Sequence, residues 1–441
     1  MYITEIAISN LRSFQGDHSL NLDRGGGTYA GWTVFAGRNG AGKSTLLKAL
    51  ALSVIGPLAS RSLAGVFTDW VHRGREDAVV RVRLVRDQVR DKVKAAGRTN
   101  KKPFWVGLKW RAAQHGTDVL ERWEDKSVEW SKSGDNGPWA DSPAGWFIAG
   151  YGPYRHLGSP PTEVVRLSAD PVMARLINLF NESATLSDAV DWLKGVHARA
   201  LENREGAAAL RDGVIRFLND GLLPDGSAVK HVDSGGLWIE RDGVEMLLEQ
   251  VSDGYRTVAA LVVDLLRRLH DSFGGLALNE VDSALVCGLP GVVLIDEVDA
   301  HMHVVWQQNI GTWLTRHFPA IQFLVTTHSP FICQAASPRG LIRLPAPREK
   351  RTVEHVEPEL FKAVVNGGAD DAVLTELFGL EHAHSARAEA LRVEVAALEA
   401  KVLRGAATAA EIEQYKELSA ELPTDIGELA DRRLRGLGVP R

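Results

Sequence analysis

The chain has 441 residues, of which 45% are hydrophobic and 24% are charged, and 51 basic against 56 acidic residues give a formal net charge of −5. This composition excludes a disordered chain, a collagen and a small disulfide scaffold. The length allows two or three domains at roughly 100 to 200 residues each. The two cysteines, Cys287 and Cys333, lie far apart in apolar surroundings and have no companions at metal-binding spacing, which favours buried thiols in a reducing compartment.

The N-terminal residues give no sign of export. Met1 is followed by an acid at Glu5, without a basic leader or a cleavage site of small residues. We also find no apolar run near the roughly 18 residues that cross a bilayer. We therefore expect a cytoplasmic protein without a membrane partner.

The charge is unevenly distributed. Residues 73–111, which begin at Arg73 and end at Arg111, hold thirteen Lys and Arg against four Asp and Glu. This local balance of +9 leaves −14 for the rest of the chain. A solvated surface and an anion-binding patch for nucleic acid are both open interpretations.

The first elements predict a strand–turn–helix unit. Residues 3–12 alternate apolar and polar side chains as a half-buried strand does, and a second strand is expected at residues 33–36. A glycine-rich turn follows, and Leu46, Leu47, Leu50 and Val54 then recur at helical spacing. Strand, glycine turn and helix in this order form a phosphate-binding unit.

The middle of the chain changes period twice. Residues 78–85 alternate with period two, and residues 105–110 and 127–130 are also strand-like, which predicts an antiparallel sheet packed on one face. Residues 171–219 carry apolar side chains at helical spacing and predict a helical insert. Two short strands, 237–240 and 244–247, flank a turn at 241–243 and predict a hairpin.

The last third predicts a buried parallel sheet followed by a helical tail. A helix beginning near Gly254, a wholly apolar strand at 292–295, a helix from His303 and a strand at 323–326 alternate along the chain. Residues 386–403 are rich in Ala, Glu and Leu, and residues 408–411 form a capping box for a further helix. The tail is expected to be a short antiparallel helical pair.

Residues 37–44, called the P-loop here, read Gly-Arg-Asn-Gly-Ala-Gly-Lys-Ser and fit the pattern G-x-x-x-x-G-K-[ST]. Glycines permit tight turns whose backbone N–H groups cradle a polyphosphate at a helix N-terminus. Lys43 should reach the β and γ phosphates of ATP, and the Ser44 hydroxyl should bind Mg²⁺. The residues expected to bind ATP here are Gly37, Asn39, Gly40, Gly42, Lys43, Ser44 and Thr45.

Two later strand ends carry candidate catalytic groups. The strand at 292–295 runs into Asp296, placed to hold Mg²⁺ through water, and Glu297, placed to deprotonate an attacking water. An apolar strand ending in two acids is weak alone, but beside a P-loop it indicates nucleotide hydrolysis. His328 follows the next strand, 32 positions after Asp296, where a histidine can sense the γ-phosphate, although a structural histidine is the alternative.

Five motifs in order resemble those of the ABC-type ATPases of the RecF, SMC and OLD group: residues 9–14, the P-loop, residues 251–256, the Asp-Glu strand end and the histidine strand end. The resemblance covers about residues 1–60 and 245–345. It implies that Ser252 and Gly254, in the signature segment 251–256, bind the γ-phosphate of ATP held by another subunit. Without that context, the segment is a helix start with Ser252 or Asp253 as N-cap.

Two further runs are similar to those of OLD-like and Septu-type defence ATPases. Residues 296–303 fit the run D-E-x-[ED]-x-H-x-H, which implies that His301 and His303 lie in a dimer-facing loop, with a metal site as the alternative. Residues 151–155 are similar to the element Y-G-x-x-R, which places Arg155 near the nucleotide, or else form a Gly-Pro turn. The chain departs from the pattern at Val304, where proline is common, and no glutamine is convincingly placed as a Q-loop.

Spacing separates the relatives. The 209 positions from Lys43 to Ser252 are too few for the long arm of an SMC protein. About 110 residues follow His328 and contain no D-x-D pair, whereas an OLD nuclease would continue with a Toprim domain. The resemblance to Septu systems therefore implies a separate effector, such as an HNH nuclease.

The sequence thus predicts an α/β fold, a P-loop NTPase of ABC-ATPase type with an antiparallel β region at 61–150, a helical insert with a hairpin at 151–244 and a C-terminal helical region at 346–441. The ATPase head is expected at residues 1–345, with its nucleotide-binding core at 1–60 and 245–345. We expect an ATP- and Mg²⁺-dependent dimeric switch, or a higher oligomer, in antiphage defence or DNA-associated sensing. A RecF-like repair ATPase and an ATP-stabilised scaffold with negligible turnover are the alternatives.

Overall fold

The computed structural model describes the chain except for residues 94–101, 114–115, 125–132, 159, 381–384 and 423–441. Contacts divide the chain into two units, a head at Met1–Phe378 and a tail at Gly379–Arg441. The head is mixed α/β and contains a parallel sheet that runs into the P-loop, which confirms the predicted fold class.

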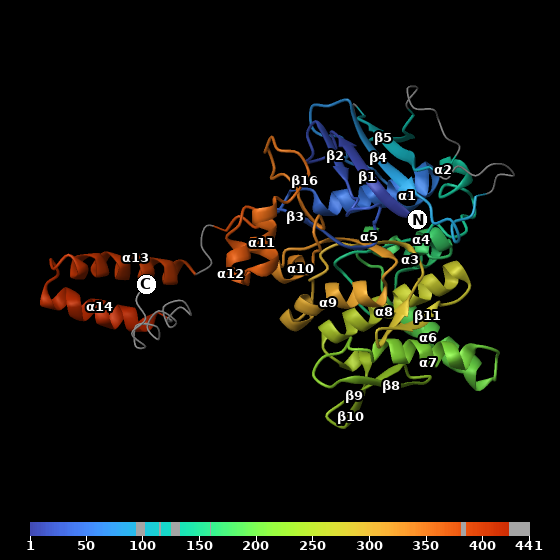
Figure 1. Ribbon diagram of the computed structural model, residues 1–441. Coiled ribbons are helices and arrows are strands. Elements are labelled where there is room, and N and C mark those ends of the chain that lie inside the picture. Colours follow the sequence, from blue (N-terminus) through green and yellow to red (C-terminus); the bar gives the residue numbers. More distant parts are fainter. Residues whose placement is uncertain (94–101, 114–115, 125–132, 159, 381–384, 423–441) are drawn as a thin grey trace. The chain divides into compact units, whose positions relative to one another are not determined.

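A six-stranded sheet forms the centre of the head (Figure 1). The five strands β15, β3, β14, β13 and β7 are parallel, and β16 is antiparallel at the edge. In spatial order the strands are β16 (Glu354–His355), β15 (Leu341–Arg343), β3 (Gly31–Ala36), β14 (Ile321–Thr326), β13 (Gly291–Ile295) and β7 (Ile148–Tyr151). The strand β7 was not predicted, because its four residues are too short a run to show a period.

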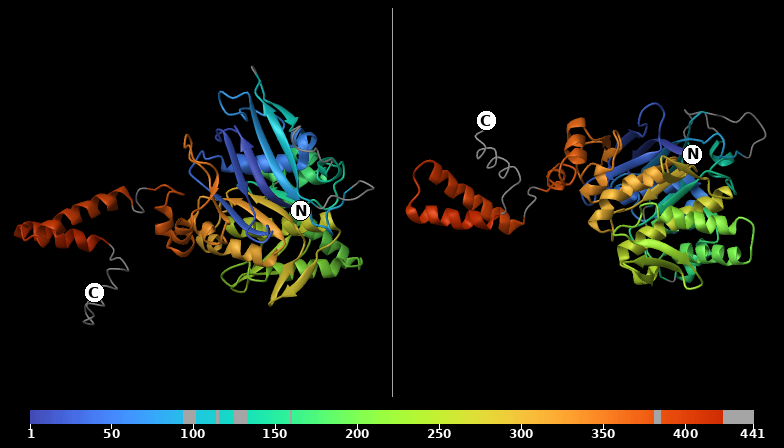
Figure 2. Two further views of the ribbon diagram at one scale, coloured as in Figure 1. Left: turned by 45° about the horizontal axis from the view of Figure 1, so that its top comes forward. Right: turned by 60° about the horizontal axis from the view of Figure 1, so that its bottom comes forward.

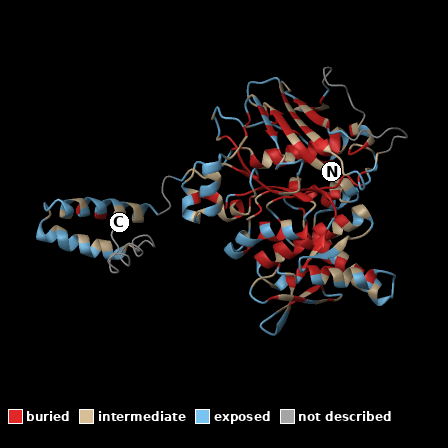
Figure 3. Cartoon of the chain, in the orientation of Figure 1, coloured by how far each residue is buried: buried red, intermediate tan, exposed pale blue. Residues whose placement is uncertain are grey.

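The apolar strands are explained by burial on both faces of this sheet. Phe35, Leu294 and Leu324 contribute to one core. Their chain neighbours, such as Val293 and Val325, contribute to the other. Figure 3 shows the resulting buried layer through the head. Successive strand residues point to opposite faces, so a strand covered on both sides needs no polar alternation.

A second, antiparallel sheet covers one side of the head. Its order is β2 (Asp17–Asn21), β1 (Tyr2–Ser9), β4 (Asp77–Val85), β5 (Phe104–Arg111) and β6 (Val119–Arg122). In β4, buried residues alternate with partly exposed ones, as the predicted one-faced packing requires. The strands predicted at 78–85 and 105–110 are confirmed, whereas the one predicted at 127–130 lies outside the described residues.

The helix α1 (Lys43–Ala64) packs between the two sheets (Figures 1 and 2). Its four predicted core residues are all buried: Leu46, Leu47, Leu50 and Val54. The helix bends at Gly56, where φ is 83° and Pro57 follows. Among the described residues α1 alone is long and apolar enough to span a membrane, yet 67% of that window is buried inside the head, as expected of a core helix.

Helices and two small sheets cover the opposite face of the central sheet. The helix α8 (Asp253–Phe273) packs there with α6 (Ser187–Leu201), α7 (Ala207–Leu218) and α9 (Val304–His317). The predicted hairpin is confirmed as β9 (Leu237–Arg241) and β10 (Val244–Leu247), joined by Asp242 and Gly243 at positive φ. The remaining elements of this region are β8 (Ala228–Val232), η1 (Leu248–Gln250), β11 (Leu278–Val281) and β12 (Ala284–Cys287).

Short helices complete the head. They are α2 (Ser133–Asn136), α3 (Thr162–Leu167), α4 (Pro171–Ala174), α5 (Ile177–Phe180), α10 (Pro330–Gln334), α11 (Pro358–Asn366) and α12 (Ala369–Val373). Ile177 and Leu179 of α5 join the core around α1, whereas Leu193 and Val196 of α6 join the core around α8. The helical insert is therefore divided between the two cores.

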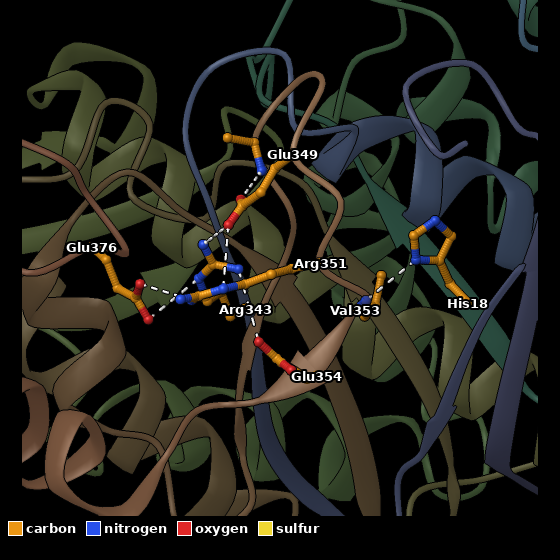
Figure 4. Close-up of polar contacts among 8 residues, drawn as sticks. His18, Arg343, Glu349, Arg351, Val353, Glu354 and Glu376 are labelled. Atoms are coloured by element: carbon orange, nitrogen blue, oxygen red, sulfur yellow. Dashed lines mark hydrogen bonds and ion pairs between the residues drawn. The ribbon is translucent and has the colours of Figure 1, made fainter. Parts of the chain in front are cut away.

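A cluster of ion pairs joins residues 346–378 to β15 and so to the rest of the head (Figure 4). Arg343 on β15 is 7% exposed and contacts Glu349 at 2.6 Å and Glu376 at 3.6 Å. Arg351 contacts the same Glu376 at 2.9 Å. The compact unit that contains the P-loop extends to Phe378, whereas the ATPase head was expected at residues 1–345.

The tail is a helical pair, α13 (Ala386–Leu403) and α14 (Ala409–Glu421). The predicted capping box is present, since the Glu411 N–H donates to Thr408 Oγ1 at 3.3 Å and the Thr408 N–H donates to Glu411 Oε2 at 2.8 Å. Lys401 on α13 contacts Glu411 on α14 at 2.6 Å. These contacts confirm the predicted helical pair.

Candidate functional site

The P-loop follows β3 and ends at Ser44, the second residue of α1. Gly40 and Gly42 have φ of 79° and 91°, a region that favours glycine. Lys43 Nζ donates to the carbonyl oxygens of Gly37 at 2.8 Å and Arg38 at 3.3 Å, so the lysine lies along the inside of the loop. Burial lowers the pKa of Lys43, and Glu297, Asp296 and Asp299 partly oppose this shift.

A cavity of about 440 Å³, called the nucleotide cavity here, opens at the P-loop. Its lining residues are Arg12, Ser13, Asn39, Gly40, Gly42, Lys43, Ser44, Thr45, Glu297 and His328. The structure thus brings most of the predicted ATP-binding residues together with all three predicted catalytic residues. Lys43 belongs to the P-loop, and Glu297 and His328 come from the ends of two other strands. Gly37 and Asp296 do not line the cavity: Gly37 accepts from Lys43, and Asp296 is only 3% exposed.

Thr326, at the end of β14, fixes the end of β13. Its hydroxyl donates to Asp296 Oδ1 at 2.5 Å and accepts from the Glu297 N–H at 2.8 Å. Glu297 has φ of 45°, a left-handed conformation that costs a non-glycine residue roughly 1–2 kcal/mol. The hydroxyl thus holds both acids in place. The prediction did not include Thr326, because only the pairing of β13 with β14 brings it beside Asp296.

Asp299, in the loop after β13, bonds to the two residues that follow β14. Asp299 Oδ1 accepts from Thr327 Oγ1 at 2.5 Å and from the His328 N–H at 3.4 Å. Thr327 is buried, whereas the side chain of His328 is exposed and borders the nucleotide cavity. The carboxylate therefore keeps His328 on the side of the sheet where Glu297 lies.

Arg12 and Ser13 were not among the predicted site residues, although the motif at 9–14 contains them. Arg12 has φ of 46°, and its guanidinium lies 4.9 Å from the centre of the Trp70 ring. Burial lowers the pKa of Arg12, which remains a cation at neutral pH. Ser13 Oγ is buried and has no hydrogen-bond partner among the described residues.

The signature segment lies outside the nucleotide cavity. Ser252 precedes α8 at the N-cap position, but its side chain makes no capping hydrogen bond. Gly254 packs so closely that a Cβ would lie 2.8 Å from Cζ3 of Trp306. Asp253 lines a separate cavity of about 230 Å³ with Tyr154 and other residues. One chain therefore does not bring Ser252 and Gly254 to its own P-loop.

Arg155 and the two histidines lie around the loop that follows β13. Arg155 does not line the nucleotide cavity, contrary to the expectation that placed it near the nucleotide; its guanidinium binds backbone carbonyls of that loop. His301 and His303 are exposed, and His303 Nδ1 accepts from the Val305 N–H at 3.4 Å. The part of the chain that the structure describes contains no group of three or more His, Cys, Asp or Glu side chains that could hold a metal ion.

The described part of residues 73–111 carries less free charge than its count suggests. Neighbouring strands supply acids, so Arg83 pairs with Glu5 and Arg111 pairs with Glu121 at 2.9 Å. Arg81 lies against the rings of Trp105 and Trp123, at 5.7 and 5.2 Å from their centres. A count along the sequence misses partners that the sheet register brings opposite.

Two family models match the chain. The model described as "AAA domain" matches residues 5–135, and the one described as "AAA domain, putative AbiEii toxin, Type IV TA system" matches residues 166–334. Together they cover the P-loop, the signature segment and the two strand ends at Asp296 and His328. The matched residues therefore include every motif that contributes to the nucleotide cavity.

Proteins with similar sequences include Septu proteins and probable retron ATPases. The Septu protein PtuA of Bacillus mycoides (strain KBAB4) is 25% identical over 342 residues, which are 77% of this chain and 39% of PtuA. The Retron Ec83 probable ATPase of Escherichia coli is 38% identical over 105 residues, 24% of this chain and 18% of that protein. The chain therefore spans well under half the length of these relatives.

Among solved structures, the crystal structure of an SMC head bound to the C-winged helix domain of ScpA aligns with this chain with a TM-score of 0.47 and 15% sequence identity. The alignment covers 81% of this chain and 99% of the SMC head chain. This likeness is too distant to carry an argument about function. Each of the two family models matches less than half of the chain. The chain is therefore similar in part to AAA domains and, over 342 residues, to the Septu protein PtuA.

Proposed function

We propose that the chain binds ATP with Mg²⁺ and hydrolyses it as a dimeric switch. One observation carries the proposal: Glu297 and His328, from two neighbouring strand ends, border the same cavity as the P-loop. The donor set fits a nucleotide, because the cavity combines P-loop amides, Lys43 and the unpartnered hydroxyl of Ser13. Bound Mg²⁺ would neutralise charge on the β and γ phosphates.

The chain's own residues supply the rest of the chemistry. Lys43 would exchange its two carbonyl partners for phosphate oxygens, and Ser44 and Asp296 would hold the Mg²⁺. Glu297 takes a proton from the attacking water, in the orientation that Thr326 sets. His328 donates to the γ-phosphate and so distinguishes ATP from ADP.

The position of the signature segment supports the proposed dimer. Ser252 and Gly254 are not in the nucleotide cavity of their own chain, so a pocket with both elements requires two chains arranged head to tail. Each pocket then combines the P-loop of one chain with the α8 N-terminus of the other, whose N–H groups favour an anion. The γ-phosphate contacts both chains and stabilises the closed state only while ATP is intact.

Steady-state turnover of Glu297→Gln tests the base. This variant is expected to bind MgATP normally and to lose at least a hundredfold in turnover, and unchanged hydrolysis would refute the assignment. Glu280→Gln is the matched control, because Glu280 lies on β11 and does not line the nucleotide cavity. Undetectable turnover by the wild type, with normal ATP binding, would instead favour a scaffold.

Mixing two inactive variants tests the composite pocket. Lys43→Ala removes the P-loop lysine, and Ser252→Arg blocks the signature segment. If each pocket takes one element from each chain, a mixed dimer holds one intact pocket, so an equal mixture should recover up to about a quarter of wild-type turnover by random pairing. A mixture no more active than its components would contradict the shared pocket.

The biological role is proposed from the relatives and the sequence motifs. The similarity to a Septu protein and to a retron ATPase supports antiphage defence with a separate effector protein, such as an HNH nuclease, in the cytoplasm. Copurification followed by mass spectrometry tests for the effector. Association with nucleic acid through residues 73–111 predicts an affinity that falls as salt rises, and binding that is absent or insensitive to salt would remove it.

A further inference from the structure

Arg155 makes an unusual set of contacts. It follows β7, it is 2% exposed, and its guanidinium donates only to backbone carbonyl oxygens among the hydrogen bonds of the described residues. Nη1 donates to Gly152 at 2.7 Å and to Asp296 at 3.0 Å. Nη2 donates to Glu297 at 3.0 Å, to Val298 at 3.1 Å and to Ala300 at 3.3 Å.

Burying this cation is unfavourable, and burial lowers the pKa of Arg155 to about 10. Four of the five contacts that offset the cost constrain the loop after β13, and the fifth is to Gly152 in the segment of Arg155 itself. Three consecutive carbonyls, those of residues 296–298, converge on one guanidinium, and such convergence forces a tight turn. Glu297 is in the middle of that turn with φ of 45°. Arg155 therefore sets the backbone conformation that turns Glu297 toward the nucleotide cavity.

The strand end that carries Arg155 is also bonded to α8. Thr257 Oγ1 on α8 donates to the Arg155 carbonyl at 3.4 Å. At the last residue of β7, Tyr151 OH donates to Asp264 Oδ2 on α8 at 3.0 Å. Both Thr257 and Asp264 are buried, so these bonds are shielded from water. A shift of α8, whose N-terminus is the signature segment, would therefore pull on Arg155 and on the turn that it holds.

We propose that Arg155 is a positioning residue: it holds Glu297 in the orientation needed for hydrolysis and connects that orientation to α8. The proposal rests on the proposed function, in which Glu297 is the base. Arg155 itself does not line the nucleotide cavity; it lines the separate cavity that contains Asp253. Lysine cannot replace it, because one ammonium group lacks the planar fork that reaches five carbonyls.

The test compares Arg155→Lys with Arg175→Lys. Arg175 is a matched control, since it is also buried, with its pKa lowered to about 10. It donates to Ser272 Oγ at 2.9 Å and lies over Phe147, and among the described residues no hydrogen bond or ion pair joins its guanidinium to the loop after β13. For each variant, kcat and the Kd for MgATP are measured, and Arg155→Lys is also combined with Glu297→Gln.

The expected result separates positioning from general damage. Arg155→Lys should lower kcat at least tenfold with the Kd for MgATP within twofold of wild type, whereas Arg175→Lys should leave both within twofold. In the Glu297→Gln background, Arg155→Lys should cause no further loss, because its effect passes through Glu297. Unchanged kcat, or an equal loss in both backgrounds, would overturn the proposal.

The turnover of Glu297→Gln distinguishes a failure of the base assignment from a failure of the proposed role of Arg155. If Glu297→Gln retains wild-type turnover, the base assignment fails; if Glu297→Gln is inactive and Arg155→Lys is not impaired, only the role of Arg155 fails. If Arg155→Lys does not fold, Thr257→Val takes its place, because it removes the bond between α8 and the Arg155 carbonyl without removing the guanidinium. That variant should lower kcat severalfold, and an unchanged kcat would overturn the proposal.

Discussion

Replacing Thr326 with valine should destabilise the protein and slow hydrolysis together. The residue is 0% exposed, and its hydroxyl is bonded to both acids at the end of β13. Valine keeps the shape of threonine but offers neither a donor nor an acceptor. Thr326→Val therefore leaves the carboxylate of Asp296 without this donor and the N–H of Glu297 without this acceptor.

The magnitude follows from those two losses. A hydrogen bond to a charged group contributes about 1.5–3 kcal/mol, and a buried N–H left without a partner costs about 1–3 kcal/mol. The two losses share one residue and are not fully additive, so we expect the free energy of unfolding to fall by about 3 kcal/mol. Thr326→Ser keeps the hydroxyl and loses one methyl group, which is worth about 1 kcal/mol.

Urea denaturation of both variants measures the difference, and steady-state turnover measures its consequence. Thr326→Val should be at least about 2 kcal/mol less stable than Thr326→Ser. Its kcat should be about tenfold lower, because Glu297 loses the bond that supports its left-handed backbone. If the two variants are equally stable and equally active, Thr326 does not hold the acids.

Three further predictions concern the P-loop and the cysteines. Lys43→Met should abolish ATP binding. Because burial lowers the pKa of Lys43 below its unfolded value of 10.5, the unfolded chain holds this proton more tightly, and the free energy of unfolding should rise as pH increases toward 10.5. Denaturation experiments at several pH values should show this rise in the wild type and not in Lys43→Met. Gly42→Ala should lower the free energy of unfolding by more than about 2 kcal/mol and abolish ATP binding, because its Cβ would lie 2.6 Å from Phe14 Cε2. Gly65→Ala is the control: Gly65 also has a positive φ but has no atom near the added Cβ, so this variant should cost about 1 kcal/mol. Cys287 and Cys333 are 0% exposed and burial raises both thiol pKa values, that of Cys287 to about 11, so a thiol reagent at pH 8 should label them only after denaturation.

The elements that the sequence predicted well are those with a strong local pattern. The P-loop, the apolar strand before Asp296 and the capping box at Thr408 are each written in consecutive residues, and each is present. The strands β7 and β2 have only four and five residues, too few for a clear local period, and β7 pairs with the distant strand β13. The boundary at Phe378 depends on Arg343 and Glu376, which meet only in the folded chain.

The same distinction applies to the site. Lys43, Glu297 and His328 could be predicted because each follows a strand, and parallel strands end at one edge of a sheet. Thr326 could not, because its role depends on the register between β13 and β14. Arg155 was expected beside the nucleotide, but a sequence does not show whether a cation faces a ligand or the backbone of a neighbouring loop.

The most direct test of the central claim is light scattering of Glu297→Gln under saturating MgATP. Closure of two chains around ATP predicts that this variant changes from monomer to dimer on adding MgATP, that ADP does not cause the change, and that adding Ser252→Arg to the variant prevents it. A variant that binds MgATP and stays monomeric would contradict the shared pocket and the switch that depends on it.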